Sequence, residues 1–258
     1  MATFIMIKAM FKRYAIELRR YWFNTLSMLV SFYLIFILMF YGIQSLAEGT
    51  VQFGGALNGM VVGFMVFYLT VYAYAELSWV LVGEASQGTL EQLSMSPLGF
   101  GRVLIARIFA ALVFRMAIMF LLLLLMMWTT GHWLHFDLLT VIPLLFFTMA
   151  SVQGIGFVMG GLALVFKQVQ AALGILQFLF VGLIAAPIEQ FPVLKFLPLS
   201  WGTRLIGDSM ISGTRLWNIP TGDLLIVGAT GIGYFTAGFI VFKYLEHMAR
   251  DRGLLGHY

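Results

Sequence analysis

Long apolar runs alternate with short polar segments along most of this chain. A transmembrane helix needs about 20 consecutive, mostly apolar residues, and the sequence contains six such runs. They lie at residues 24–43, 55–75, 103–127, 138–165, 171–188 and 224–242. The fourth run is long enough to tilt or break in a bilayer. The pattern therefore predicts an all-α membrane protein with six transmembrane helices.

Residues 1–23 have a different pattern, with apolar side chains at helical spacing on one side and basic side chains on the other. The apolar side carries Ile7, Met10, Phe11, Tyr14, Leu18 and Tyr21, and the basic side carries Lys8, Lys12 and Arg19. A helix of this kind favours the headgroup layer of a membrane. We therefore predict an N-terminal interfacial amphipathic helix; the alternative is a cytosolic extension of the first span.

The segment 189–223 is too polar to span a membrane and too apolar for a free loop. Its apolar residues include Phe191, Phe196 and Trp201, and Pro192 and Pro198 interrupt any long helix. Irregular backbone at membrane depth must be buried in protein or face water. The segment is therefore predicted to form short re-entrant outer helices.

A polar island at residues 84–99 stands between the second and third runs. Gly88 permits a sharp turn, Thr89 and Gln92 fit a capping box, and Pro97 ends the helix that they start. The island therefore predicts one short helix at the membrane surface.

Leu90 and Leu93 share one face of that short helix. An ordinary loop rarely places paired leucines in water, whereas exposed apolar residues on a helix suit the groove of another protein. We therefore expect both leucines to face outward and to dock on a partner, with a plain cytoplasmic loop as the alternative.

The composition agrees with a membrane protein. The 258 residues are 61% hydrophobic and 10% charged, whereas soluble domains average about 45–50% and about 25%. The net charge of +4 could suggest nucleic acid, but the basic residues stand beside apolar spans, as membrane-flanking residues do. Cysteine is absent, which excludes disulfides, Cys-based zinc sites and thiol nucleophiles. The predicted domains are 1–23, the membrane domain 24–243 and a tail at 244–258.

Lys and Arg set the predicted orientation, because cytoplasmic flanks of spans are enriched in both. Eleven of them flank alternate span ends, namely Lys8, Lys12, Arg13, Arg19, Arg20, Arg102, Arg107, Lys167, Lys243, Arg250 and Arg252. The opposite side carries Glu48 and Asp137. The long outer segment is an exception to this charge pattern, because it carries the basic residues Lys195, Arg204 and Arg215. Both termini and the island are thus predicted to lie in the cytoplasm, with the chain in the cell membrane.

Small residues mark faces for close helix packing. They recur as Gly55-x-x-x-Gly59-x-x-x-Gly63 in the second run and Gly156-x-x-x-Gly160 in the fourth. Packing within one chain and packing between two chains both remain open.

The island resembles the signature of ABC-2 type transporter permeases. The resemblance rests on the run Glu84-x-x-x-Gly88-Thr89-Leu90-Glu91-Gln92-Leu93-x-x-Ser96-Pro97 and, less specifically, on Leu197-Pro198-Leu199-Ser200-x-x-x-Arg204. It implies six spans, an amphipathic N-terminal helix and a cytoplasmic coupling helix that docks on a separate ATPase. The residues implied in coupling are Glu84, Gly88, Thr89, Leu90, Glu91, Leu93 and Pro97. Many members carry Arg beside the first Glu, and Val82-Gly83-Glu84 does not.

The resemblance also implies partners. No G-x-x-x-x-G-K-[ST] loop is present, so ATP and Mg are expected in a partner ATPase and this chain is not expected to be an enzyme. A second copy of the chain is implied, with spans one and five helping to pair the copies and spans two and five facing the path. The implied activity is export, including multidrug efflux.

Few polar residues are available to line a path. They are Asn58, Tyr68 and Tyr72 in the second span and Gln170 and Gln177 in the fifth. We expect these two faces to meet at a central path near the axis between two copies, which would suit a lipophilic or amphipathic substrate; the alternative is ordinary packing.

Charge inside the spans is confined to few sites. Burying the charge of Arg115 in the third span is costly. Arg115 therefore either takes part in transport or has a structural role, in which it pairs with Glu76 or extends toward the headgroups. His132, His135 and Asp137 could bind a metal, but interfacial polar roles are the stronger interpretation and no metal is expected.

Two rival classes remain from the sequence. A non-ABC membrane carrier or substrate-capture protein would need a preformed polar pocket. An intramembrane enzyme would need clustered catalytic residues, and the sequence has no G-x-S-x-G or H-E-x-x-H motif.

Overall fold

The computed structural model describes residues 2–47, 54–95 and 99–253, which are helical throughout their regular parts and contain no strand. The elements are α1 (Ala2–Arg20), α2 (Trp22–Ala47), α3 (Gly54–Ser86), α4 (Leu90–Ser94), α5 (Phe100–Thr130), α6 (Leu138–Phe166), α7 (Gln170–Ile184), η1 (Pro192–Phe196), α8 (Ser200–Ser212), η2 (Leu216–Asn218) and α9 (Thr221–Asp251). The predicted all-α class is therefore confirmed.

Five of these helices, α2, α3, α5, α6 and α9, are long and apolar enough to cross a membrane. The fifth predicted span, 171–188, is matched only by α7, which has 15 residues. At about 1.5 Å per residue it reaches about 22 Å, short of a hydrocarbon core of about 30 Å. Five helices of spanning length are therefore present within the described residues, and the sixth span stays a prediction. Helix α7 ends before residue 188 because the residue before Pro187 is disfavoured in a helix.

Local sequence explains where several helices stop and start. Gly131 ends α5 in the left-handed conformation, at φ 71°, and its N–H donates to the carbonyl of Met127. The Asp137 carboxylate then caps α6 by accepting from the N–H of Leu139 and from the Thr140 hydroxyl at 2.6 Å. The turn between α5 and α6 is thereby fixed by glycine freedom and by a side-chain cap.

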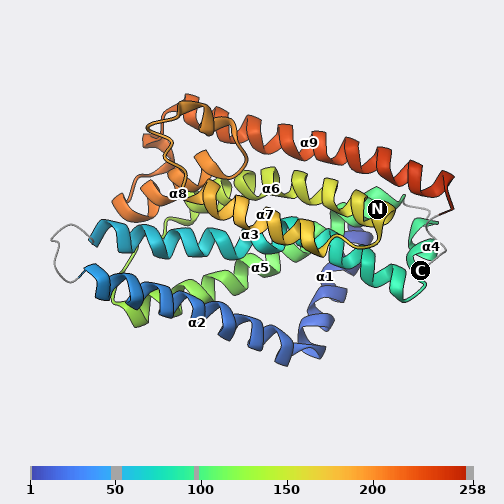
Figure 1. The fold of residues 1–258 in the computed structure, drawn as a ribbon, viewed down its shortest axis with the longest axis horizontal. Helices are drawn as coiled ribbons and strands as arrows, with labels where there is room; N and C mark the ends of the chain where they lie inside the picture. The colour runs from blue at the N-terminus through green and yellow to red at the C-terminus, as the bar shows by residue number, and fades with distance from the viewer. Residues whose placement is uncertain (1, 48–53, 96–98, 254–258) are drawn as a thin grey trace.

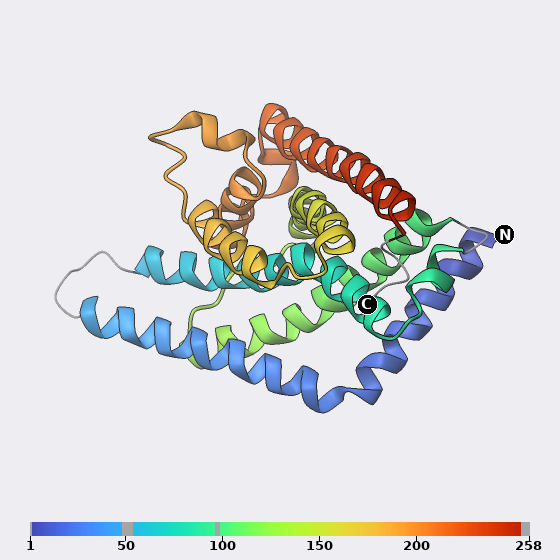
Figure 2. The same cartoon turned by 45° about the vertical axis from the view of Figure 1, so that its right-hand side comes forward.

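The helices form a bundle in which α6 lies between α9 and α3 (Figures 1 and 2). Beyond α3 lies α5, and α2 runs along the edge with most of its apolar surface exposed. One end of the bundle, called here the α4 end, holds α4, α1 and the last turns of α9 (Figure 1). The opposite end holds α8, η1 and η2.

Close approach at glycines holds α6 against both neighbours. A Cβ at Gly156 would lie 2.9 Å from the carbonyl oxygen of Ala73, and one at Gly160 would lie 2.6 Å from Leu77, both on α3. The packing role predicted for these two glycines is confirmed. Gly59, by contrast, has open space where its Cβ would be, and the surroundings of Gly55 lie outside the description.

A second glycine contact joins α6 to α9. A Cβ at Gly238 would overlap the backbone carbonyl of Gly154, and one at Gly231 would lie 2.6 Å from the carbonyl oxygen of Phe147. The sequence pattern of small residues at fourth positions did not indicate this interface. Backbones this close gain dispersion and weak Cα–H contacts without side-chain ordering.

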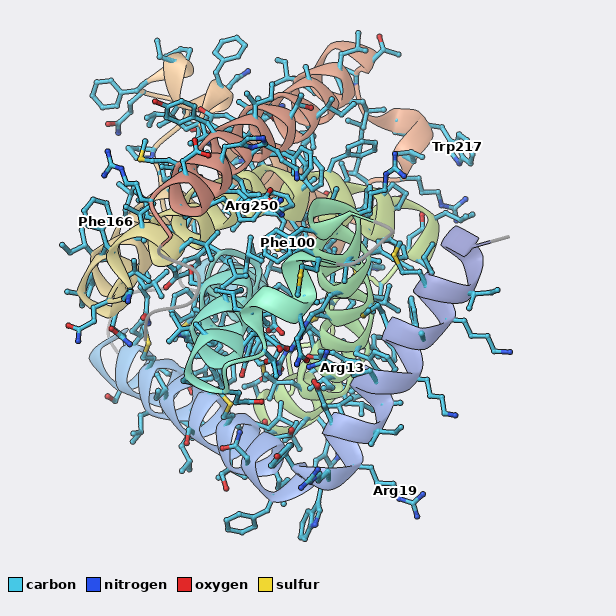
Figure 3. All side chains as sticks on the ribbon, turned by 90° about the vertical axis from the view of Figure 1, so that its right-hand side faces the viewer. Arg13, Arg19, Phe100, Phe166, Trp217 and Arg250 are labelled. Atoms are coloured by element: carbon cyan, nitrogen blue, oxygen red, sulfur yellow. The ribbon has the colours of Figure 1, made fainter. Side chains whose placement is uncertain are left out.

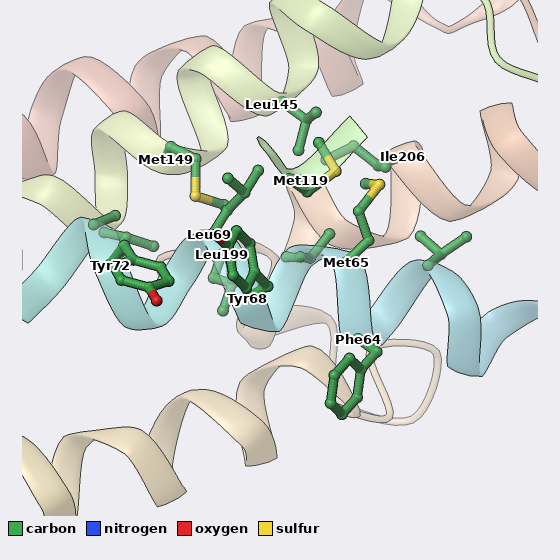
Figure 4. Packing of buried hydrophobic residues seen from close by; sticks show 14 of the residues in the cluster. Phe64, Met65, Tyr68, Leu69, Tyr72, Met119, Leu145, Met149, Leu199 and Ile206 are labelled. Atoms are coloured by element: carbon green, nitrogen blue, oxygen red, sulfur yellow. The ribbon is translucent and has the colours of Figure 1, made fainter. Parts of the chain in front are cut away.

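The largest buried cluster lies where α3 meets α6 and α8. Figure 4 shows Met65 and Leu69 of α3 beside Leu145 and Met149 of α6 and Ile206 of α8. The predicted short helices of 189–223 are present as η1, α8 and η2. Because α8 buries one face in this cluster, it is part of the bundle rather than a separate layer.

The N-terminal helix α1 is amphipathic as predicted, but part of its apolar side packs on protein. Tyr14 is buried and stacks on Phe114 of α5 at 5.1 Å between ring centroids, and Phe11 lies 6.3 Å from Phe109. Aromatic residues on both helices make this contact favourable. Part of the apolar side of α1 therefore lies against α5, and the interfacial location of the helix stays a prediction.

The last helix runs past the predicted boundary at residue 243. It continues to Asp251, and Glu246 is buried within it, 2.7 Å from the Lys243 amino group and 2.5 Å from the Arg250 guanidinium. Residues 254–258 of the predicted tail lie outside the description.

Candidate functional site

Glu84, in the last turn of α3, joins four segments at the α4 end. Its Oε1 atom accepts from Arg13 Nη2 of α1 at 2.8 Å and from Arg107 Nη1 of α5 at 2.9 Å. Its Oε2 atom accepts from the Thr89 hydroxyl at 2.6 Å, directly before α4. One carboxylate thus ties α1, α3, α4 and α5 together.

The charges of this cluster are partly shielded from water. The Glu84 side chain is 12% exposed and that of Arg107 is 15% exposed, whereas Arg13 is 45% exposed. Burial lowers the pKa of Arg13, but hydrogen bonds to Glu17 and Glu84 outweigh it, so the pKa of Arg13 lies above its ordinary value. Loss of the carboxylate would leave the largely buried Arg107 guanidinium without a counter-charge, so Glu84 stabilises the contact among these segments.

The helix α4 faces inward more than the sequence predicts. Leu90 is only 3% exposed and lies in a buried cluster with Leu81, Phe100 and Leu104. Leu93 is half-buried and packs between that cluster and the one formed by α1 and α5. The expectation that both leucines face water is therefore wrong, because a helix of one turn cannot hold its own conformation and must be anchored by its apolar face.

The outward side of α4 carries other residues. Gln92 is exposed, and Met95 directly after the helix is 73% exposed. Gly88 adopts φ 70°, so the predicted turn is present. Thr89 precedes the helix as predicted, and its hydroxyl donates to the Glu84 carboxylate. The side chain of Glu91 and all of Pro97 lie outside the description.

Arg115 and Glu76 form the pair that the sequence indicated. Arg115 Nη2 lies 3.7 Å from Glu76 Oε2, and both side chains are largely buried. The Arg115 guanidinium also lies 3.7 Å from the centroid of the Tyr72 ring and 5.9 Å from that of Tyr14. A carboxylate and aromatic faces together stabilise this cation between α3 and α5.

A cleft of about 940 Å³ opens at the same end, bounded by α1, α2, α3 and α5. Five basic residues line it, namely Lys12, Arg13, Arg20, Arg107 and Arg115, together with the carboxylates of Glu17, Glu76 and Glu84. The lining thus carries an excess of two positive charges. Figure 3 looks onto this end: Arg13 lies between α1 and the centre of the bundle, and Arg19 points away.

The residues predicted to line a path do not come together within one chain. Tyr68 is 1% exposed, and its ring packs on Phe32 of α2 at 5.1 Å and on Tyr72 at 4.9 Å. Helix α7 instead meets α3 through Tyr74, whose hydroxyl donates to the Leu173 carbonyl at 3.1 Å. Within one chain Tyr68 and Tyr72 turn toward α2 and α5, and a meeting of the two faces between paired copies stays a prediction.

The other predicted polar residues are placed separately. Gln170 is exposed and Gln177 is half-buried on α7. Asn58 Oδ1 lies 2.7 Å from His132 Nδ1, while Asp137 caps α6. His132 and Asp137 thus have separate structural partners, and the described residues contain no group of three or more His, Asp or Glu arranged to hold a metal ion.

The two guanidinium partners of Glu84 and the cleft were missed from the sequence. One signal was available, because Arg13 and Glu17 are four apart in a helix and their side chains pair at 2.9 Å. The pair of Arg13 and Glu17 marks a polar edge beside the apolar side of α1. The sequence did not indicate that this edge of α1 contacts α3.

Comparison of the chain with protein-family models, with curated proteins and with solved structures finds no match.

Proposed function

We propose that this chain is the membrane-spanning permease subunit of an ATP-driven ABC exporter. It moves a lipophilic or amphipathic substrate out of the cell, and a separate ATPase subunit binds ATP and Mg. The observation that carries the proposal is the attachment of α4 to three long helices through Glu84.

A coupling element must pass force from a soluble partner to the spans. Helix α4 meets this need because Leu90 anchors it in the bundle and Thr89 ties its start to Glu84. A push on its outward side, at Gln92 and Met95, then moves α3 and α5 as rigid bodies. The buried Leu90 serves as the anchor in this mechanism, and the partner contacts the exposed residues.

The proposed arrangement has six spans and two copies. The segment through Ile188 would complete the short α7 as a sixth span, and both termini and α4 would face the cytoplasm of a cell membrane. The exposed apolar surfaces of α2 and α7, including Leu38 at 74% and Phe178 at 80%, are the surfaces proposed to pair the copies. A route between copies would then pass Gln170 and Gln177 rather than Tyr68 and Tyr72.

The test is reconstitution of the chain with a P-loop ATPase that co-purifies with it from native membranes. Met95→Asp should weaken ATPase association and abolish ATP-dependent transport, because it places a charge in a docking groove. Trp217→Asp is the matched control, since Trp217 is 76% exposed in η2 at the opposite end. If no ATPase co-purifies, or if both variants transport equally, the proposal fails.

One observation favours the rival carrier or substrate-capture protein. Such a protein needs a preformed polar pocket, and the cleft beside α1 is one. Transport or capture in vesicles without ATP and without an ATPase would select this class instead.

A further inference from the structure

Two cations of the cleft beside α1 have no carboxylate partner within the described residues, although the Arg20 guanidinium lies 5.6 Å from the centroid of the Tyr21 ring. Arg13 and Arg107 are held by Glu84, and Arg115 is held by Glu76 and Tyr72. Lys12 and Arg20, in contrast, form no ion pair within the described part of the chain. Both are exposed and line the cleft, so an anion can bind there without breaking an existing pair.

The rim of the cleft is apolar and lies where α1 turns into a membrane helix. Ile16, Tyr21 and Trp79 line the cleft and are 55%, 56% and 45% exposed. Helix α2, one of the five apolar helices, begins directly after Tyr21. This junction therefore stands at a membrane surface, where Trp and Tyr favour the headgroup level.

From this combination of charge, apolar rim and position, we propose that the cleft binds the phosphate headgroup of an anionic membrane lipid. Lys12 and Arg20 bind the phosphate, and the upper acyl chain lies along Ile16 and Trp79. A volume of about 940 Å³ accommodates a headgroup with the start of its chains. This inference is independent of the proposed export function, because it requires neither ATP nor an ATPase.

A free phosphate ion would share the charge chemistry but not the apolar rim. A soluble anion gains nothing from Trp79 and Ile16, whose exposed surfaces are covered only when an amphiphile is bound. The observations therefore favour the lipid over inorganic phosphate.

The test measures lipid binding to the purified full chain in neutral detergent by native mass spectrometry. The probes are phosphatidylglycerol, phosphatidylcholine and inorganic phosphate, each added alone. Lys12→Gln/Arg20→Gln removes the two unpaired cations of the cleft. Lys8→Gln/Arg19→Gln is the matched control, because it removes the same charge from exposed positions of α1 outside the cleft.

Wild-type protein should bind phosphatidylglycerol in preference to phosphatidylcholine. The cleft variant should lose about 25-fold in affinity, at roughly fivefold per basic residue near the anion, and the control variant less than about threefold. Equal losses in the two variants would mean general electrostatic attraction and would overturn the site. Binding of inorganic phosphate with no preference for phosphatidylglycerol would overturn the lipid as occupant.

A second measurement locates the acyl chain. Phosphatidylglycerol with brominated chains should quench tryptophan fluorescence in the wild type, and part of that quenching should disappear in Trp79→Phe. Unchanged quenching in Trp79→Phe would show that the lipid binds elsewhere.

Discussion

Replacing Gly238 by Ala should destabilise the bundle although the change adds only one methyl group. The new Cβ would overlap the backbone carbonyl of Gly154, and a backbone group cannot rotate out of the way. Helices α6 and α9 must therefore move apart. A gap of about 0.5–1 Å already forfeits about a quarter to a half of the dispersion energy of each contact, and these two helices pack along most of their lengths.

The magnitude follows from two opposing terms. Overpacking costs about 1–3 kcal/mol, and the rigid obstacle places Gly238→Ala at the upper end of that range. Replacing a helical glycine by alanine returns about 0.8–1.0 kcal/mol through helix propensity. The net loss in the free energy of unfolding should thus be about 2 kcal/mol.

Gly233→Ala in the same helix is the matched control, because nothing lies within 4 Å of its Cβ position. It should stabilise the protein by about 0.8–1.0 kcal/mol, so the two variants should differ by about 3 kcal/mol. Unfolding in mixed micelles with increasing SDS, followed by circular dichroism, measures the difference. Equal stability of the two variants would refute the close α6–α9 crossing.

Three further predictions concern the α4 end. Glu84→Gln should lower the free energy of unfolding by about 2–3 kcal/mol, because Arg107 loses its counter-charge. The loss is smaller than for a fully buried pair, since Arg13 is half exposed. An unchanged SDS midpoint would show that Glu84 does not stabilise the contact among α1, α3, α4 and α5. Leu90→Ala should lower the free energy of unfolding by about 2–4 kcal/mol, because it leaves a cavity. Met95→Ala should change the free energy of unfolding by less than about 0.5 kcal/mol. A larger loss in Met95→Ala than in Leu90→Ala would show that Leu90 faces outward after all. In intact cells an impermeant thiol reagent should label Trp217→Cys and spare Met95→Cys, a clean experiment in a chain without cysteine; labelling of Met95→Cys alone would invert the proposed orientation.

Hydropathy predicted the long helices because burial in a bilayer depends on local composition. The same local reasoning continued the fifth helix to residue 188, whereas α7 ends at Ile184, since an apolar average does not register that Pro187 disfavours a helical conformation at the preceding residue. Helix packing was predicted only where glycines recur at every fourth position. Gly154 and Gly238 lie on different helices, and no spacing within one segment could pair them.

The sequence indicated some residues of the candidate site, but neither the direction of Leu90 nor the two guanidinium partners of Glu84. Sequence reasoning identified Glu84, Thr89 and Leu90, and it paired Arg115 with Glu76 from depth in the membrane alone. It reversed the direction of Leu90, because exposure was inferred from a loop position while the buried surface is supplied by α3 and α5. Long-range partners such as Arg13 and Glu84, 71 positions apart, require the fold.

The bend between α1 and α2 lets a small change in the angle of α1 produce a large displacement at its far end. Only Tyr21 separates the two helices, and the 19 residues of α1 extend about 28 Å from that point. A swing of about 10° would carry the far end of α1 by about 5 Å, and Arg13, about 12 Å from the pivot, by about 2 Å. That displacement is enough to separate Arg13 from Glu84, which are joined at 2.8 Å. The Arg13–Glu84 pair and the packing of Tyr14 on Phe114 therefore hold α1 at its angle together, and the width of the cleft depends on that angle.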